Sequence, residues 1–385
     1  MAELAVRPEV SSRAIVDSNP RLRASDPRDV AATINLAKFE AEFSKPTYSV
    51  VLVPQIRVSR YTSETELDSE DYFVSLSASK ILERNQFSGE FSYQRENSIT
   101  TEQTDSGIFN VNIPRTRYSL DASWLHTLTE RASVSAFGNA LDVSFEEDPR
   151  STFINYSQFG VGSSFSYALS ETTILRATYS FSNFKTPQTS SDTRSHSYRI
   201  GFEHQLDESV NVAFSIGQNV SEIEFKSAQT QLVSLNPLRF ATIVTDESER
   251  SAGEILDLAV EKEFERALLR FEWDRVFSPS SQGARQQEEN VGGFARYRIS
   301  RFVDAEFNGS FRQRTQEGTA NTRLLNDLEV LKFGMRVLYR ITPEWRAEAG
   351  FRYRRQERIN AGTTADSEML FIALRFRPQR LDIPY

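Results

Sequence analysis

The sequence has no cysteine and only three histidines, and both shortages exclude classes of functional site. Without cysteine, the chain forms no disulfide and offers no thiolate metal ligand or thiol nucleophile. The histidines, His126, His196 and His204, do not follow a metal-binding spacing, and we expect them near the ends of strands. Phosphate-binding glycine loops and nucleophile-elbow motifs are missing as well. We therefore expect no enzymatic activity, no metal and no cofactor.

The sequence also lacks long apolar runs, an excess of positive charge and a signal peptide. No stretch approaches about 18 consecutive apolar residues, which a membrane-spanning helix would need. Lys and Arg number 45 against 53 Asp and Glu, and the net charge of −8 argues against nucleic acid as a partner. Met1 leads directly into polar sequence, so either the protein stays inside the cell or it is a mature chain from which an export signal has been removed. The strand pattern described below favours the mature chain.

What the sequence does contain is an alternation of apolar and polar residues with a period of two. In the segment 117–124, Tyr118, Leu120, Ala122 and Trp124 alternate with Arg, Ser and Asp. The segments 303–312 and 345–354 follow the same pattern. Because successive side chains of a strand point to opposite faces of its sheet, each segment predicts a strand with one apolar and one polar face.

Short polar turns alternate along the chain with longer polar loops. The short turns lie at 83–85, 129–131, 170–172, 207–209, 265–266, 300–301 and 342–344. The longer loops lie near 62–70, 98–114, 146–155, 185–194, 222–252, 277–286, 314–326 and 358–366. Propeller blades and soluble sandwiches use shorter strands, typically about 5–6 residues long. The pattern therefore predicts an all-β fold, a transmembrane antiparallel up-and-down barrel of about 16 strands in the bacterial outer membrane.

A barrel in lipid must close, because no water satisfies an unpaired strand edge there. We expect the barrel to cover residues 47–377 and its last strand, Ser367–Phe376, to pair with its first, Tyr48–Arg60. The residues 378–385 are then a C-terminal tail, since Pro378 cannot donate to a strand ladder.

A separate N-terminal segment is predicted over residues 1–46, where the alternation is missing. Asp26 and Pro27 suit the start of a helix at about 27–44, and Leu36, Phe39 and Phe43 lie at helical spacing. Such a helix could plug the lumen, dock a periplasmic export partner or pack under the barrel rim. The sequence leaves these three roles open.

The polar faces of the predicted strands, which should line the lumen, are rich in arginine toward the C-terminus. The candidate solute path consists of Arg296, Arg298, Arg312, Arg336, Arg340, Arg352 and Arg354. Cations outnumber anions on this part of the wall, and a charged wall sets the selectivity of a channel. The planar arginine fork matches carboxylates, phosphates and sugar hydroxyls. An internal network of ion pairs that stiffens the wall explains the same residues equally well.

The predicted loop at 222–252 is unusually apolar for a surface segment. Its residues Leu232, Leu235 and Leu238 are candidates for a constriction, if the loop folds into the channel. The alternative is that the loop crowns the outer rim without entering the lumen.

Two stretches resemble a known protein family. They are Arg95-Glu96-Asn97-Ser98-Ile99-Thr100-Thr101-Glu102 with Thr104-Asp105-Ser106-Gly107, and Arg115-Thr116-Arg117-Tyr118-Ser119 continuing to Trp124 and Leu128-Thr129-Glu130-Arg131. Both resemble outer-membrane β-barrel porins encoded with exopolysaccharide and exosortase systems. The resemblance covers about 86–135 and marks a loop and a turn. It implies passage of an extracellular polysaccharide or related cargo across the outer membrane, without a cofactor or a catalytic residue.

The sequence thus predicts a porin-like channel that passes exopolysaccharide or other polar or anionic solutes through an arginine-lined lumen. Its expected partners are outer-membrane lipid, the solute and periplasmic export proteins that bind residues 1–46, while oligomerisation is left open. The alternative function is a structural or assembly barrel that anchors an export complex and has no open pore.

Overall fold

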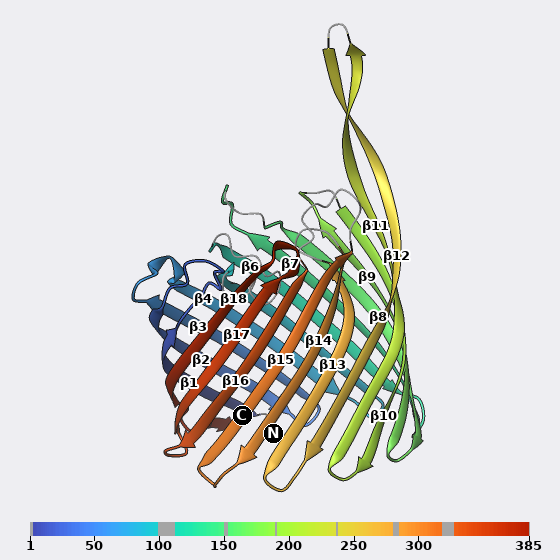
Figure 1. Cartoon of the computed structure of the whole chain (residues 1–385). Helices are drawn as coiled ribbons and strands as arrows, with labels where there is room; N and C mark the ends of the chain where they lie inside the picture. The colour runs from blue at the N-terminus through green and yellow to red at the C-terminus, as the bar shows by residue number, and fades with distance from the viewer. Residues whose placement is uncertain are drawn as a thin grey trace.

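The chain forms one antiparallel β-sheet that closes into a barrel (Figure 1). This computed structural model describes residues 3–98, 112–149, 153–188, 191–235, 238–279, 285–317 and 327–384. For residues 225–244 and for several strand ends, it describes the backbone alone. Two three-residue 3₁₀ segments are described, η1 (Thr65–Leu67) and η2 (Ile359–Ala361). None of the described helices is long and apolar enough to cross a membrane.

Strands account for most of the described chain, and each pairs with its neighbours in sequence. Their bounds are β1 (Glu3–Asp17), β2 (Val30–Lys45), β3 (Tyr48–Tyr61), β4 (Ser69–Ile81), β5 (Asn85–Asn97), β6 (Pro114–Thr127), β7 (Ala132–Phe145), β8 (Tyr156–Ser170), β9 (Thr173–Thr186), β10 (Ser191–Asp207), β11 (Val210–Leu235), β12 (Leu238–Glu263), β13 (Ala267–Pro279), β14 (Arg285–Arg298), β15 (Val303–Glu317), β16 (Leu328–Arg340), β17 (Trp345–Arg358), β18 (Thr363–Phe376) and β19 (Leu381–Pro384).

The barrel wall has 18 strands, so the expected membrane-type barrel is confirmed and the expected number of about 16 is wrong. The closing contact joins β18 to β1, from Val10 opposite Phe376 to Asp17 opposite Met369. The predicted pairing of the last strand with Tyr48–Arg60 is therefore wrong, because β1 and β2 lie between them. After a break at 377–380, the short β19 resumes pairing with the start of β1, so the predicted tail is partly strand.

The N-terminal segment is part of the wall, and the predicted helix at 27–44 is wrong. Val30–Lys45 is strand β2, which pairs along its length with β1 and β3. Of the three plug candidates, Leu36 lines an internal cavity, whereas Phe39 is 43% exposed on the outer face and Phe43 shares its phase. Because residues 3–45 form two wall strands and their connecting loop, they provide neither a lumen plug nor a separate docking segment.

The false helical pattern has a physical cause at the closing seam. Ala32 of β2 packs inside the barrel against Ile15, Met369 and Phe371, with Ile34 beside them. Here apolar side chains up to Leu36 face inward while Thr33 and Asn35 are exposed on the outer face, and from Lys38 onward the usual phase returns with Phe39 outward. The alternation therefore changes phase within β2, and no single apolar face runs along the segment. Apolar residues on both faces of β2 then happened to recur at helical spacing.

The outer face is an apolar surface that suits lipid. On β16, Leu331, Phe333 and Met335 are 41%, 42% and 45% exposed, and they alternate with inward side chains such as Val330, which is 5% exposed. Large exposed apolar side chains occur on the same phase around the wall. A soluble protein does not expose such a continuous apolar surface. The alternation therefore follows the arrangement of a transmembrane barrel, with apolar residues outside and polar residues inside.

The turns at one end of the barrel are short and hold themselves with local hydrogen bonds. Thr129 and Thr342 accept backbone N–H groups of the third residue beyond them, at 3.0 and 3.1 Å. Asp207 accepts both the hydroxyl and the N–H of Ser209 at 2.7 Å, and these bonds lower the pKa of Asp207. Polar side chains that bond to the backbone favour tight turns. The chain begins and ends at this short-turn end (Figure 1).

The opposite, long-loop end carries a two-stranded ribbon that projects far beyond the other strands (Figure 1). Its strands β11 and β12 have 26 residues each and stay paired up to Leu235 opposite Leu238. At about 3.3 Å per residue, the ribbon extends roughly 40 Å beyond a 14-residue wall strand.

The predicted irregular loop at 222–252 and its inward fold are therefore wrong. The backbone of Leu232, Leu235 and Leu238 lies in the ribbon, directed away from the lumen (Figure 1). The physical reason is that the hydrogen-bond ladder of the wall continues into the ribbon, and an inward fold would break it.

Candidate functional site: the inner wall and the seam cavity

The seven predicted arginines all lie on the inward phase of strands β14 to β17. Cross-strand partners on this phase include Glu306 opposite Arg296 on one side and opposite Arg336 on the other. Arg352 and Arg354 line an internal cavity. The period-two pattern therefore placed these side chains on the correct face, because each strand keeps its alternation across the whole wall.

Glu306 is the centre of the first ion-pair group on this wall. Its carboxylate accepts a hydrogen bond from Arg296 Nε at 2.8 Å and another from Arg336 Nε at 2.6 Å. The Glu306 residue itself is only 4% exposed. One carboxylate thus holds two arginines on neighbouring strands, and both bonds are charge-assisted.

Two further carboxylates hold predicted arginines in the same way. Glu288 pairs with Arg312 and with Arg314, each at 3.1 Å. Asp17, which is 3% exposed, accepts a hydrogen bond from Arg354 at 3.0 Å. Four of the seven predicted arginines are therefore members of ion pairs that stiffen the wall, which is the alternative interpretation of the arginine pattern.

The other three arginines differ, because within the described residues their side chains form no ion pair or hydrogen bond. They are Arg298, Arg340 and Arg352. Arg298 and Arg340 end their strands at the short-turn end. Arg352 lies deeper in the wall, and so does Lys332, which also has no such partner among the described residues. Lys332 faces Arg354 directly across β16 and β17, so cationic side chains accumulate here.

The seam cavity, as we call the space beside Arg352, lies along the inner faces of β17, β18, β1, β2 and β3. Its volume is about 580 Å³, and its lining consists of Glu9, Ser11, Arg13, Ile15, Asp17, Pro20, Ile34, Leu36, Lys38, Gln55, Arg57, Ser59, Tyr61, Leu67, Glu348, Arg352, Arg354, Met369, Ala373 and Arg375. The lining contains six cationic and three anionic side chains. The cavity therefore combines an apolar part with an excess of positive charge.

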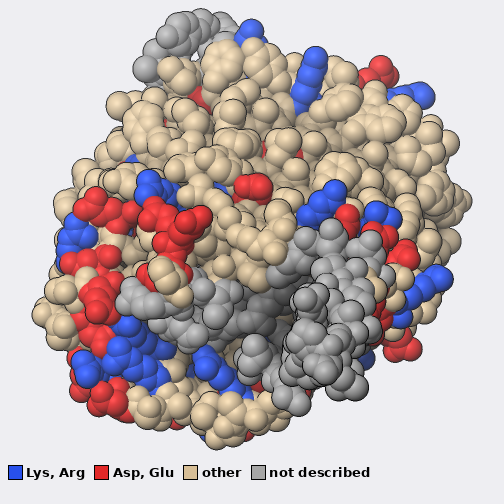
Figure 2. Space-filling view, turned by 90° about the horizontal axis from the view of Figure 1, so that it is seen from above, with Lys and Arg blue, Asp and Glu red and all other residues tan. Residues whose placement is uncertain are grey.

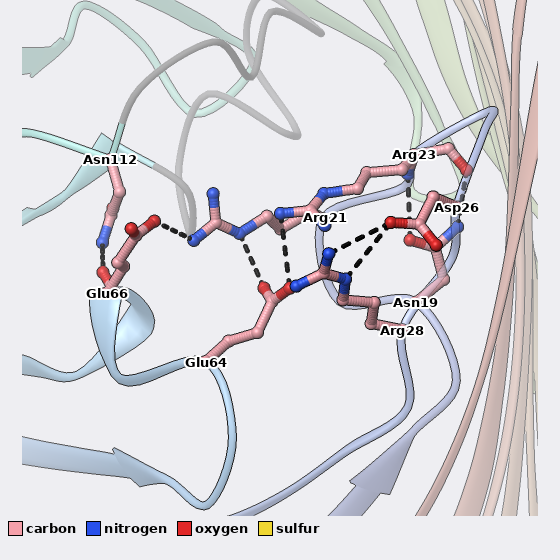
Figure 3. A network of polar contacts seen from close by, with 8 residues as sticks. All are labelled: Asn19, Arg21, Arg23, Asp26, Arg28, Glu64, Glu66 and Asn112. Carbon is pink, nitrogen blue, oxygen red and sulfur yellow. Dashed lines mark hydrogen bonds and ion pairs between the residues drawn. The ribbon is translucent and has the colours of Figure 1, made fainter.

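Polar side chains of the β1–β2 and β3–β4 loops meet at the long-loop end of the barrel (Figure 3), and both loops contribute to the lining of the seam cavity. The β1–β2 loop contributes Pro20, and the β3–β4 loop contributes Leu67, which is 2% exposed. Ion pairs tie the loops together: Glu64 holds Arg21 at 2.8 Å and Arg23 at 3.3 Å. This loop layer borders the cavity at the long-loop end of the barrel.

The loop layer is also fixed to the wall beneath it. The Asn19 side chain donates to the carbonyl oxygens of Arg23, at 2.9 Å, and of Asp366, at 3.0 Å. Its backbone N–H donates to Asp17 at 2.9 Å. At this end of the barrel, acidic and basic side chains are intermixed around the rim (Figure 2). The outer boundary of the seam cavity is thus a structured, ion-paired layer.

Sequence reasoning missed the residues that β1 contributes to the site, among them Arg13 and Asp17. Arg13 lies over the ring of Phe371 at 4.6 Å and pairs with Glu348 at 3.6 Å. A weak signal was present, because Glu9, Arg13 and Asp17 share one phase while Val10 and Val16 share the other. The signal is weak because Pro8 and Ser12 interrupt the outward apolar phase of this strand.

The three histidines lie on the outward phase of their strands, and His126 and His196 contact the rings of Trp124 and Tyr179. His126 bonds to Asn85 at 2.9 Å, His196 to Tyr179 at 2.9 Å and His204 to Thr173 at 2.8 Å. Over the part of the chain that the structure describes, no group of three or more His, Asp or Glu side chains is arranged to hold a metal ion.

Comparisons with known proteins support the fold. No protein-family model matches the chain, and no curated protein matches it. The ferric-catecholate import receptor Fiu from K12 E. coli, in its closed form, matches with a TM-score of 0.52 and 6% identity over 96% of this chain and 81% of the receptor. The outer membrane protein opdK from Pseudomonas aeruginosa matches with a TM-score of 0.45 and 8% identity over 100% of this chain and 99% of that chain. At 6% identity, the likeness to the receptor shows the fold alone, an outer-membrane type of barrel.

Proposed function

We propose that the protein is a porin-like channel of the bacterial outer membrane that passes polar and anionic solutes. The observation that carries this proposal is a closed barrel of 18 strands with an apolar outer face and a charged inner face. Barrels of 16–18 strands leave an aqueous interior, whereas barrels of about eight strands are filled by their own side chains. The long loops then face the cell exterior, as is usual for such barrels.

The charge of the inner wall supports a preference for anions. Carboxylates neutralise many of the wall arginines, but Arg298, Arg340, Arg352 and Lys332 have no ion-pair partner among the described residues. Unpaired cations along a pore attract anions and raise their local concentration. The resemblance over about 86–135 extends the proposal to extracellular polysaccharide, whose charged and hydroxyl groups arginine forks can bind.

Recording in planar lipid bilayers tests the channel directly. The refolded full chain should insert with stepwise increases in conductance, and a potassium chloride gradient should give a zero-current voltage of the sign for chloride preference. Migration on gels with and without boiling serves as the folding control, because a closed barrel resists detergent until it is heated. A protein that shows this shift but never conducts would overturn the channel and favour a structural barrel.

A further inference from the structure

The seam cavity has the size and lining of a small-molecule site. Its volume of about 580 Å³ lies within the usual range of about 300–1,000 Å³ for ligand pockets. Ile15, Ile34, Leu36 and Met369 give one part of its lining an aliphatic surface. Such sites typically combine an apolar surface with a few polar groups that fix the orientation of the ligand.

The carboxylates in the cavity are already bonded to cations. Glu348 pairs with Arg13 at 3.6 Å and with Arg375 at 3.1 Å, and Glu9 pairs with Arg375 at 3.6 Å. Asp17 is held by Arg354 and by the hydroxyl of Ser367 at 2.8 Å. Each of the three carboxylates in the cavity is therefore paired with a cation other than Arg352, and none of them forms an ion pair with Arg352.

Arg352 is an arginine of this cavity without an ion-pair partner. Its side chain is exposed to the cavity, and within the described residues it forms no hydrogen bond and no ion pair. Its cross-strand neighbour is Gly334, which has no side chain to cover the guanidinium. Its charged surroundings are Arg13, Arg336, Arg354 and Asp17, three cations against one anion. A guanidinium in this position offers an unused planar fork.

The chemistry of this arrangement selects one class of ligand. A planar fork matches a carboxylate with two parallel hydrogen bonds. The aliphatic lining favours a ligand with an apolar body and disfavours a compact, strongly hydrated anion such as inorganic phosphate. Apart from Pro20 and Leu67 of the loop layer, the lining side chains belong to the inner faces of wall strands, so we expect such a ligand to enter from the barrel interior.

We propose that the seam cavity binds a small organic carboxylate, with the carboxylate on Arg352 and the apolar body against Ile15, Ile34, Leu36 and Met369. This inference rests on the proposed channel function and extends it, since it specifies a class of solute that binds to the inner wall during passage. Binding itself does not require an open pore, so the two proposals are tested separately.

Isothermal titration calorimetry on the full chain in a non-ionic detergent tests the site, with sodium benzoate as the probe. Benzoate should bind saturably at one site per chain. Benzamide, which lacks the charge, and acetate, which lacks the apolar body, should each bind at least about tenfold more weakly. Inorganic phosphate should also bind at least about tenfold more weakly. Equal binding of benzamide, acetate or phosphate would refute the proposed recognition.

Substitutions locate the binding site. Arg352→Gln should weaken benzoate binding at least about tenfold, and Arg352→Lys should weaken it less, since it keeps the charge but loses the fork. Arg346→Gln is the matched control, because Arg346 lies on the same face of β17 outside the cavity. Benzoate binding that survives Arg352→Gln in a heat-modifiable, folded barrel would overturn the assignment. Conductance without benzoate binding would refute this site alone, and binding without conductance would refute the channel alone.

Discussion

Asp17 and Arg354 form a hydrogen-bonded ion pair at 3.0 Å although 337 positions separate them in the sequence. Asp17 ends β1 and Arg354 belongs to β17, with β18 between them. Ser367 of β18 donates to the same carboxylate at 2.8 Å. One buried carboxylate thus connects three strands across the closing seam, and it also accepts the N–H of Asn19 from the loop layer.

Asp17→Asn should destabilise the barrel, because it removes the carboxylate that accepts a hydrogen bond from the buried Arg354 guanidinium. Removing one partner of a buried pair costs about 3–5 kcal/mol. We expect a lower urea midpoint for unfolding from lipid vesicles, followed by the fluorescence of the three tryptophans. The matched control is Asp26→Asn, whose pair with Arg28 is exposed and should contribute about 0–1 kcal/mol. Equal midpoints for both variants would contradict the importance of the seam carboxylate.

Glu64→Gln should loosen the loop layer, since it removes both ion pairs that join Glu64 to Arg21 and Arg23. A protease cleaves the locally opened state of a loop, so the cleavage rate rises with the fraction of molecules in which the loop is open. We expect trypsin to cleave after Arg21 about tenfold faster in the variant, as followed by mass spectrometry of the peptides.

The control for this experiment is Glu66→Gln. Glu66 also pairs with Arg21 at 2.8 Å, but its side chain is 81% exposed, so its contribution should be small. Cleavage after Arg21 that accelerates equally in both variants would show that the buried position of Glu64 does not matter.

Glu306→Gln should increase the preference of the pore for anions. The substitution removes the carboxylate shared by Arg296 and Arg336 and adds one net positive charge to the inner wall. We expect the chloride-to-potassium permeability ratio to rise about twofold, measured from zero-current voltages in a salt gradient. Glu208→Gln, in an exposed turn outside the lumen, should leave the ratio unchanged. A ratio that falls, or that stays constant in both variants, would argue against an ion path along this wall.

The absence of cysteine allows a direct test of orientation. Single cysteines can be introduced by Ser25→Cys in the β1–β2 loop and Glu265→Cys in the turn after β12, two exposed positions at opposite ends of the barrel. A membrane-impermeant maleimide added to intact cells should label the first variant and not the second. Both should react after the cells are lysed. The reverse labelling pattern would place the long loops in the periplasm.

Strands β16 and β2 differ in how well their structure can be predicted from the sequence alone. On β16, lipid contacts one face and the lumen the other, so the alternation of Leu331, Lys332 and Phe333 predicts both the strand and the direction of each side chain. On β2, Ala32 and Ile34 pack inside the barrel against β1 and β18 while Thr33 is exposed outside, so the alternation is reversed there and changes phase before Phe39. The predicted helix failed there because tertiary packing had replaced the polar inner surface.

The sequence by itself determined the class of fold, the short-turn rhythm and the inward phase of the arginine-rich strands, because these depend on local alternation and turn chemistry. Only the tertiary structure decided the number of strands, the course of the β11–β12 ribbon and the partners of each arginine. It also decided that Arg354 is neutralised by Asp17 while Arg352 is not. Such pairings depend on which strands meet at the seam, and this information is spread over the whole length of the chain.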